Sequence, residues 1–261
     1  MTALLTTKLR QPVSLRKVVQ RPQLIQRLKA GFESGHQIFL VSAPAGFGKT
    51  SCVSEWVNTL DNWSVTWLSL DVSDDDPRRF YTYLIAALQK VDANLGQELE
   101  GILRFGQLPP TEIISTTLIN DILELENNFL LVLDDFHVIQ DRFILEVLEK
   151  LIINLPQPLH LALVTREDPP LPLARLRAKN QLTEIRAKDL RFSNHDIERF
   201  LNDVMNLSLS EVDIGTLRDK TEGWIVGLQL ASLSIRDRDD PSGFIGALSG
   251  SHRHILSYGP G

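Results

Sequence analysis

The chain has 261 residues, 43% of them hydrophobic and 23% charged, which predicts a globular protein with one α/β domain and a smaller helical part. Its formal net charge of −6 argues against direct binding of this chain to DNA. Cys52 is the only cysteine, so an intramolecular disulfide is excluded and a cytoplasmic location is expected. No apolar run is long enough to predict a signal peptide or a membrane span.

The first predicted elements flank the segment SAPAGFGKTS, residues 42–51. Gln37–Val41 is a short apolar run typical of a buried strand, and Lys49–Leu60 carries apolar residues at helical spacing. Gly46 and Gly48 allow the backbone between them to approach a phosphate closely. A turn of this kind directs its backbone N–H groups and the helix N-terminus at a polyphosphate. The alternative is a chance run of small residues.

A phosphate-binding loop assigns distinct roles to its last residues. Lys49 is expected to neutralise the β- and γ-phosphates, and the Thr50 hydroxyl to bind Mg²⁺. The pattern asks for glycine at position 43, where Ala43 is tolerated if its φ stays negative. The predicted nucleotide-binding loop is Ala43, Pro44, Ala45, Gly46, Phe47, Gly48, Lys49, Thr50 and Ser51.

The chain then continues to alternate between strand and helix patterns. Trp63–Leu70 predicts a second strand, and the next helix is expected to start with Asp76 as N-cap and Pro77 at its first position. Gly96–Pro110 is interpreted as a linker because glycine and proline punctuate it, and Thr111–Glu126 as a helix.

A strand that ends in two acids provides an independent check on the nucleotide site. Phe129–Leu133 is apolar and is followed by Asp134, which is placed to hold Mg²⁺, and by Asp135, which is placed to act on the attacking water. The alternative is a buried strand that ends in solvated acids. A helix is expected from about residue 141 to 154.

Two more strands complete the expected sheet. Leu159–Asp168 is apolar and carries Thr165 and Arg166 near its end, and residues 181–187 form a last short strand after a helical turn. The repetition predicts a doubly wound parallel sheet of the P-loop NTPase type, with ligand at the carboxyl ends of the strands. The expected nucleotide-binding domain is 1–190.

Beyond residue 190 the strand patterns stop, and residues 191–235 are expected to form a helical subdomain. Ser193 and Asp196 form a capping-box pattern before one helix, and Ser210–Lys220 is a second. A third helical stretch contains Gly223 and Gly227, which we expect on one closely packed face.

The last part of the chain, 236–261, is expected to be a polar linker to residue 243 followed by one amphipathic helix. An isolated helix of this length is marginal in water, so we expect fraying from about residue 237 onward.

Together these segments resemble a known family. TKLRQPVSLRKVVQRPQLIQRL, VSAPAGFGKT, LVLDDFHVI, LVTREDPPLPLARLRAKNQLTEIRAKDLRFS, TEGWIVGLQLA and FIGALSGSHRHIL occur in this order. They are similar to the ATPase module of the LuxR-type large ATP-binding regulators, which include the maltose-regulon activator, in the STAND class of AAA+-related P-loop NTPases. The resemblance covers about residues 7–256, and this family tolerates alanine at the position of Ala43.

The resemblance implies an ATP/ADP-controlled switch for signal transduction, with slow Mg²⁺-dependent hydrolysis and self-association in the ATP state. The resemblance also assigns a catalytic role to Arg166, as a sensor arginine, in addition to Lys49 and Asp135. It also places Val19 and Arg21, within the segment 18–21, near adenine. In the family the last segment opens a winged-helix domain, and the chain continues into a helical-repeat sensor and a DNA-binding helix-turn-helix. The resemblance thus implies that 236–261 is a linker and the truncated start of a winged-helix domain, and that the inducer-binding and DNA-binding parts are absent here.

Other classes of P-loop protein were compared by their motifs. A GTPase would need an N-K-x-D motif and an ABC transporter ATPase an LSGGQ signature before its acidic strand, and neither is present. A nucleotide-binding interaction module with negligible hydrolysis and a stand-alone ATPase or kinase remain alternatives.

Overall fold

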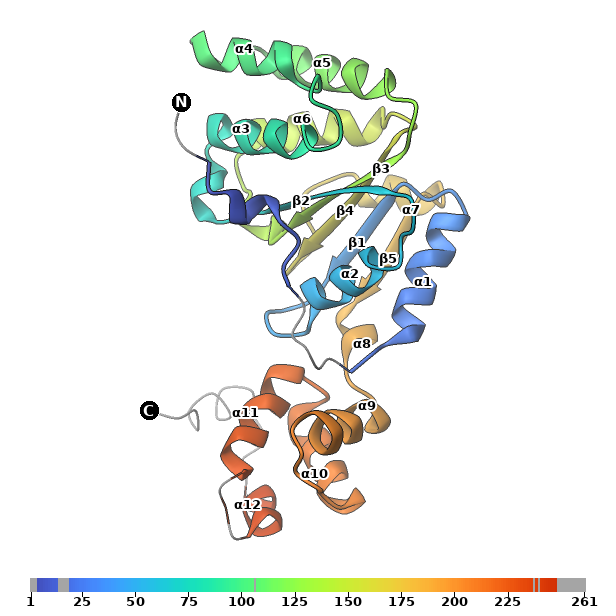
Figure 1. Ribbon diagram of the computed structural model, residues 1–261, viewed down its shortest axis with the longest axis vertical. Helices are drawn as coiled ribbons and strands as arrows, with labels where there is room; N and C mark the ends of the chain where they lie inside the picture. Colours follow the sequence, from blue (N-terminus) through green and yellow to red (C-terminus); the bar gives the residue numbers. More distant parts are fainter. Residues whose placement is uncertain (1–3, 14–18, 106, 237, 239, 248–261) are drawn as a thin grey trace.

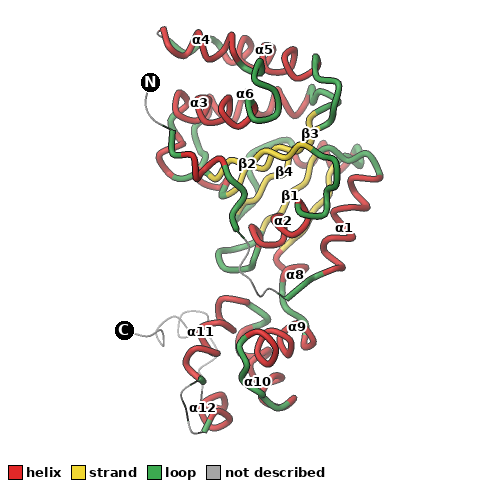
Figure 2. Tube along the Cα trace, viewed as in Figure 1, coloured by secondary structure: helices red, strands yellow, loops and turns green. Residues whose placement is uncertain are grey.

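Five parallel strands form the central sheet in the order β2-β3-β4-β1-β5 (Figures 1 and 2). The strands are β1 (Ile38–Ser42), β2 (Ser64–Ser69), β3 (Phe129–Asp134), β4 (Leu159–Thr165) and β5 (Leu182–Arg186). This computed structural model describes residues 4–13, 19–105, 107–236, 238 and 240–247. The five strands expected from the sequence, and their parallel pairing, are confirmed.

Both faces of the sheet are buried, which explains why its strands read as continuous apolar runs. Every residue of β1, β3 and β4 is buried. Successive side chains point to opposite faces, so Leu40 joins one core, whereas Phe39 and Val41 join the other.

Helices cover both faces, so the sheet is doubly wound as predicted (Figure 1). One core is built with α1 (Pro22–Glu33) and α2 (Lys49–Val57). The other core is built with the helices α3 (Pro77–Leu88), α4 (Gln97–Phe105), α5 (Thr111–Leu123) and α6 (Arg142–Ile153). The short helices α7 (Leu173–Ala178) and α8 (Ala187–Leu190) flank β5. Among the residues that the structure describes, no helix has the length and apolarity needed to cross a membrane.

A separate helical subdomain follows α8 and lies beyond one end of the sheet (Figure 1). It contains α9 (Asn194–Glu198), a π-helical segment (Arg199–Val204), α10 (Glu211–Thr221), α11 (Ile225–Ile235) and α12 (Pro241–Ala247). These elements share a third apolar core, which includes Ile197, Leu217 and Leu228. The chain therefore buries its apolar residues on both faces of a sheet and in one helical cluster.

Two helix starts expected from the sequence are confirmed in detail. The Asp76 side chain accepts a hydrogen bond from the backbone N–H of Arg79, and Pro77 occupies the first turn of α3. Ser193 and Asp196 form a reciprocal capping box at α9.

The expectation of a linker over Gly96–Pro110 is wrong, because this segment contains α4. Leu99 and Leu103 lie one turn apart and are buried in the core beside α3. Gly96 and the two prolines mark the ends of the segment, whereas its amphipathic interior, which includes Gly101, packs as a helix.

Gly223 and Gly227 do not share a helix face as expected. Gly223 lies before α11 with φ +71°, and a Cβ there would meet the Phe192 carbonyl oxygen at 2.6 Å. Gly227 lies within α11, where a Cβ would meet the Trp224 ring at 2.7 Å. Each glycine is closely packed, but against a different neighbour.

The end of the described chain also differs from the expectation of a polar linker up to residue 243. Helix α12 begins at Pro241, and its Ile245 is only 1% exposed in the core of the helical subdomain. Burial of this side chain stabilises residues 241–247 as a helix. Fraying from about residue 237, as measured by amide exchange, stays a prediction. The rest of the expected amphipathic helix lies outside the described residues.

A cluster of buried ion pairs holds the N-terminal residues 6–9 against the edge of the sheet. The 3₁₀ helix η1 (Thr6–Leu9) packs against the edge strand β2. Its Lys8 ammonium pairs with Asp74, whose side chain is fully buried, and lies 2.6 Å from Asp71 Oδ2. Arg79 Nε lies 2.9 Å from the other Asp74 oxygen. Because a buried carboxylate needs its partners, this cluster fixes the segment in place.

Lys8→Met should lower the free energy of unfolding by about 3 kcal/mol, because it removes one partner of a buried carboxylate. Arg218→Met is the matched control, since Arg218 pairs with Asp219 on the surface, and it should cost less than about 1 kcal/mol. Urea unfolding of both variants measures the difference. Equal losses would show that the buried cluster contributes no more than a surface pair.

Candidate functional site

The loop after β1 adopts the backbone geometry that phosphate binding requires. Gly46 and Gly48 both have φ +77°, a conformation that glycine adopts at little cost. Ala43 is 2% exposed, does not take a positive φ, and donates its N–H to the Thr165 carbonyl oxygen at 3.3 Å. The methyl group of Ala43 is thus accommodated where the pattern asks for glycine.

Lys49 begins α2 and lies at the centre of the site. Its side chain is mostly buried, and Nζ donates to the Pro44 carbonyl oxygen at 3.1 Å. Burial lowers the pKa of Lys49, and the nearby cation of Arg166 lowers it further, whereas Asp135 and Asp134 act in the opposite direction. An added anion would offset both unfavourable effects, so the site favours a negatively charged ligand.

The carboxyl end of β3 brings Asp134 to the start of α2. Its Oδ1 accepts hydrogen bonds from the Thr50 hydroxyl at 3.1 Å and from the Asp135 backbone N–H at 3.0 Å. Burial, helped by the charge of Asp135, raises the pKa of Asp134 to about 6. The carboxylate therefore costs stability at neutral pH, and this cost is relieved as the pH falls through about 6. A cation beside Asp134 would have the same stabilising effect.

Asp135 differs from Asp134 in conformation and exposure. It adopts a left-handed φ of 56°, and its side chain is 49% exposed toward the cavity. His137 Nδ1 lies 3.8 Å from Asp135 Oδ1, and burial lowers the pKa of His137. The two adjacent acids thus occupy different environments, one buried beside Thr50 and the other facing the cavity.

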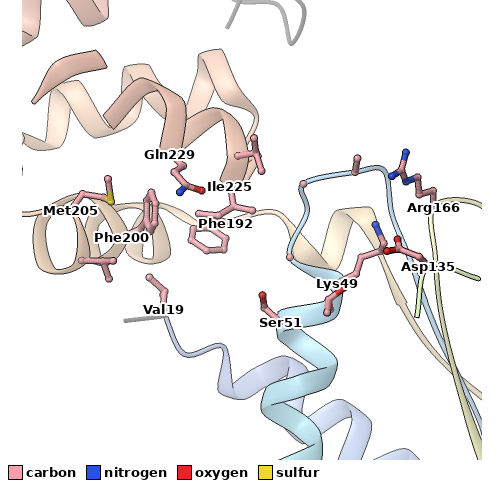
Figure 3. A pocket seen from close by; sticks show the side chains of 16 residues that line it. Val19, Lys49, Ser51, Asp135, Arg166, Phe192, Phe200, Met205, Ile225 and Gln229 are labelled. Atoms are coloured by element: carbon pink, nitrogen blue, oxygen red, sulfur yellow. The ribbon is translucent and has the colours of Figure 1, made fainter. Parts of the chain in front are cut away.

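A cavity of about 430 Å³ joins this polar group to the helical subdomain (Figure 3). Its polar end is formed by the loop, Lys49, Thr50, Asp135 and Arg166. The opposite end is largely apolar and is lined by Val19, Phe192, Phe200, Val204, Met205, Ile225, Val226 and Gln229. A cavity with one cationic and one apolar, aromatic end matches the two halves of a nucleoside polyphosphate.

Not every residue predicted for nucleotide binding lines this cavity. Ala45, Gly46, Gly48, Lys49, Thr50, Ser51 and Val19 do. Ala43 and Phe47 are buried in the core beside α2, and Asp134 lies behind Thr50. Arg21 borders a smaller adjoining cavity of about 90 Å³ and binds backbone carbonyls of residues 189–191.

Of the apolar end, only Val19 was expected from the sequence, through the family resemblance. Phe200 and Val204 belong to the π-helical segment, and Ile225 and Gln229 to α11, which were expected only as helices. Phe192 lies in the segment that leads from the end of α8 to the start of α9, residues 189–193, which we call the crossover. The available signal was the segment TEGWIVGLQLA, whose Trp and paired glycines already indicated a closely packed helix.

Trp224 connects the helical subdomain directly to the phosphate-binding loop. Its indole N–H donates to the Ala45 carbonyl oxygen at 3.1 Å. A Cβ at Gly46 would lie 2.8 Å from the same nitrogen and 2.7 Å from Val226 Cγ2. Gly46 is therefore required for two reasons: it adopts the positive φ of the loop, and it allows the subdomain to pack closely against the loop.

The chain is similar to a regulator and to a solved ATPase. Over 233 residues, 89% of this chain, it is 33% identical to the HTH-type transcriptional regulator MalT of Yersinia enterocolitica and 32% identical to that of Yersinia pestis. The chain spans about a quarter of these relatives, 25% of each. A scan against protein-family models finds no match.

A solved structure supports the fold independently. The Walker-type ATPase Paby2304 of Pyrococcus abyssi superposes with a TM-score of 0.57 over 94% of this chain and 75% of that chain, at 15% identity. This likeness concerns the fold, whereas the similarity to MalT concerns the sequence. Together they show that this chain has the α/β fold of P-loop NTPases and is homologous to a segment that makes up about a quarter of MalT.

Proposed function

We propose that the chain is an ATP/ADP-binding switch module of a signal-transducing transcriptional regulator and that it hydrolyses ATP slowly with Mg²⁺. The observation that carries this proposal is the cavity between the phosphate-binding loop and the helical subdomain. A ligand that spans it contacts both parts of the chain, so ATP and ADP can favour different arrangements of the two. Self-association in the ATP state is part of the same proposal.

In this proposal the polar end of the cavity holds the phosphates. The N–H groups of the loop and the Lys49 ammonium bind the phosphate oxygens. Thr50 and Asp134 hold Mg²⁺, which neutralises phosphate charge when bound, and their contact of 3.1 Å fits a shared ion. Asp135 orients or polarises the attacking water, and Arg166 senses the terminal phosphate from the end of β4.

The apolar end then takes the base. Phe192 and Phe200 supply aromatic faces, and Val19 lies opposite them in Figure 3. A regulator identity is proposed for the whole protein because MalT carries the name of a transcriptional regulator. An interaction module with negligible hydrolysis is the alternative, and the measured turnover separates the two.

Lys49→Ala should lower the affinity for ATP and ADP at least tenfold, which corresponds to about 1.4 kcal/mol, because the buried cation faces the phosphates. Isothermal titration calorimetry with each nucleotide measures this loss. The control is Lys179→Ala, an exposed lysine outside the cavity, which should bind like the unchanged protein. Unaltered affinity in Lys49→Ala would remove the phosphate-site assignment.

Asp134→Asn and Asp135→Asn should separate metal binding from hydrolysis. Asp134→Asn should reduce the gain in ATP affinity that Mg²⁺ provides, because the buried carboxylate beside Thr50 is lost. Asp135→Asn should keep that gain and slow turnover, because its side chain faces the cavity. Titrations with Mg²⁺ and with EDTA, together with phosphate release, measure both effects. Identical binding defects in the two variants would contradict the assigned roles.

A further inference from the structure

Arg21 binds the backbone of the crossover that connects the sheet domain to the helical subdomain. It lies at the N-cap position of α1, two residues after Val19. Its guanidinium donates to three consecutive carbonyl oxygens, of Leu190 at 2.8 Å, Asp189 at 2.9 Å and Arg191 at 3.0 Å. These residues end α8 and lead into the helical subdomain.

The same guanidinium also contacts the first elements of the subdomain. Its Nε lies 3.4 Å from Asp196 Oδ2, the oxygen that accepts from Ser193 in the capping box of α9. Its central carbon lies 5.1 Å from the centre of the Phe192 ring, within the range of a cation–π contact. Arg21 therefore holds the crossover, the start of α9 and an aromatic ring at once.

These contacts lie next to the apolar end of the cavity. Phe192 and Val19 both line the cavity, whereas Arg21 does not. Arg21 is 8% exposed, and three of the five guanidinium N–H groups are used by backbone carbonyls. Most of the hydrogen-bonding capacity of this side chain is thus used by the protein itself, and a direct contact between Arg21 and adenine stays a prediction.

We propose that Arg21 is a positioning residue. It determines the geometry of the base-binding end of the nucleotide cavity, because it holds the crossover and Phe192 next to Val19. The inference rests on the proposed nucleotide-binding function. Without the guanidinium, the three carbonyl groups lose their donor and the crossover carries Phe192 away from Val19. The phosphate end, built on β1 and α2, keeps its geometry.

The planar guanidinium is essential to this role. Lysine presents a single point charge and cannot match three carbonyls and an aromatic face in the same way. Arg21→Lys therefore retains a cation near Asp196 but loses the fork. Arg21→Met, which removes the guanidinium and its charge, is the first test variant, and Arg21→Lys is the second variant if Arg21→Met does not fold.

The test compares a ligand with a base and a ligand without one. Calorimetry with Mg-ATP and with Mg-tripolyphosphate is performed on the unchanged protein and on the Arg21 variants. We expect at least a tenfold loss of Mg-ATP affinity and less than a twofold change for tripolyphosphate, by the arithmetic of about 1.4 kcal/mol per factor of ten. An unchanged ratio of the two affinities would overturn the inference. Failure of the unchanged protein to bind Mg-ATP would instead remove the proposed function.

Arg27→Met provides the matched control. Arg27 lies in α1 and contacts the Asp189 carboxylate at 3.1 Å, but its side chain is 49% exposed, and the three crossover carbonyls accept from Arg21. In Arg27→Met, the ratio of the affinities for Mg-ATP and Mg-tripolyphosphate should match that of the unchanged protein. A change equal to that of the Arg21 variants would assign the effect to Asp189 and overturn the role of Arg21.

Trypsin cleavage of the protein without nucleotide separates positioning from direct contact with the base. Lys188 and Arg191 are exposed, Lys188 directly before the three carbonyl groups that Arg21 binds and Arg191 carrying the last of them. The Arg21 variants should be cut after these residues several-fold faster, as followed by mass spectrometry, because the crossover is released. Unaltered cleavage, even with a selective loss of ATP affinity, would show that Arg21 acts by touching the base and would overturn its positioning role.

Discussion

The nucleotide site depends on the close contact between the phosphate-binding loop and the helical subdomain. The Trp224 indole N–H donates to the Ala45 carbonyl oxygen, and the side chains of Trp224 and Val226 leave no space for a side chain at position 46. The positive φ of Gly46 and this packing require glycine for separate reasons. The loop is held between β1 and the subdomain, and residues of both parts line the cavity in which we propose that the nucleotide binds.

The two ends of the cavity come from different parts of the fold. The sheet domain supplies the charged end with Lys49, Asp135 and Arg166, and the helical subdomain supplies most of the apolar end. Between them, the chain crosses over at residues 189–191, where Arg21 holds the backbone. In the proposed switch, this short segment is the part of the chain that connects the two ends of the cavity.

Local patterns were sufficient to predict the sheet, the phosphate-binding loop and the two acids of β3, whereas Arg166 was assigned only through the family resemblance. The strands are continuous apolar runs, and the loop after β1 and the acids of β3 follow the carboxyl ends of the two strands that flank β4, so the parallel topology brings them to one edge of the sheet. Helix α4 was missed because glycine and prolines at its boundaries outweighed its amphipathic interior. Phe192, Phe200 and the role of Arg21 depend on contacts between segments more than 150 residues apart in the chain, which no local pattern reports.

The central claim is that one ligand is bound by both the sheet domain and the helical subdomain. Amide hydrogen exchange with and without Mg-ADP tests it most directly, because exchange is resolved along the chain. The account predicts that Mg-ADP slows exchange in residues 43–57 and also in residues 192–205 and 224–229. Protection confined to residues 43–57 would show that the helical subdomain does not take part in binding and would contradict the account.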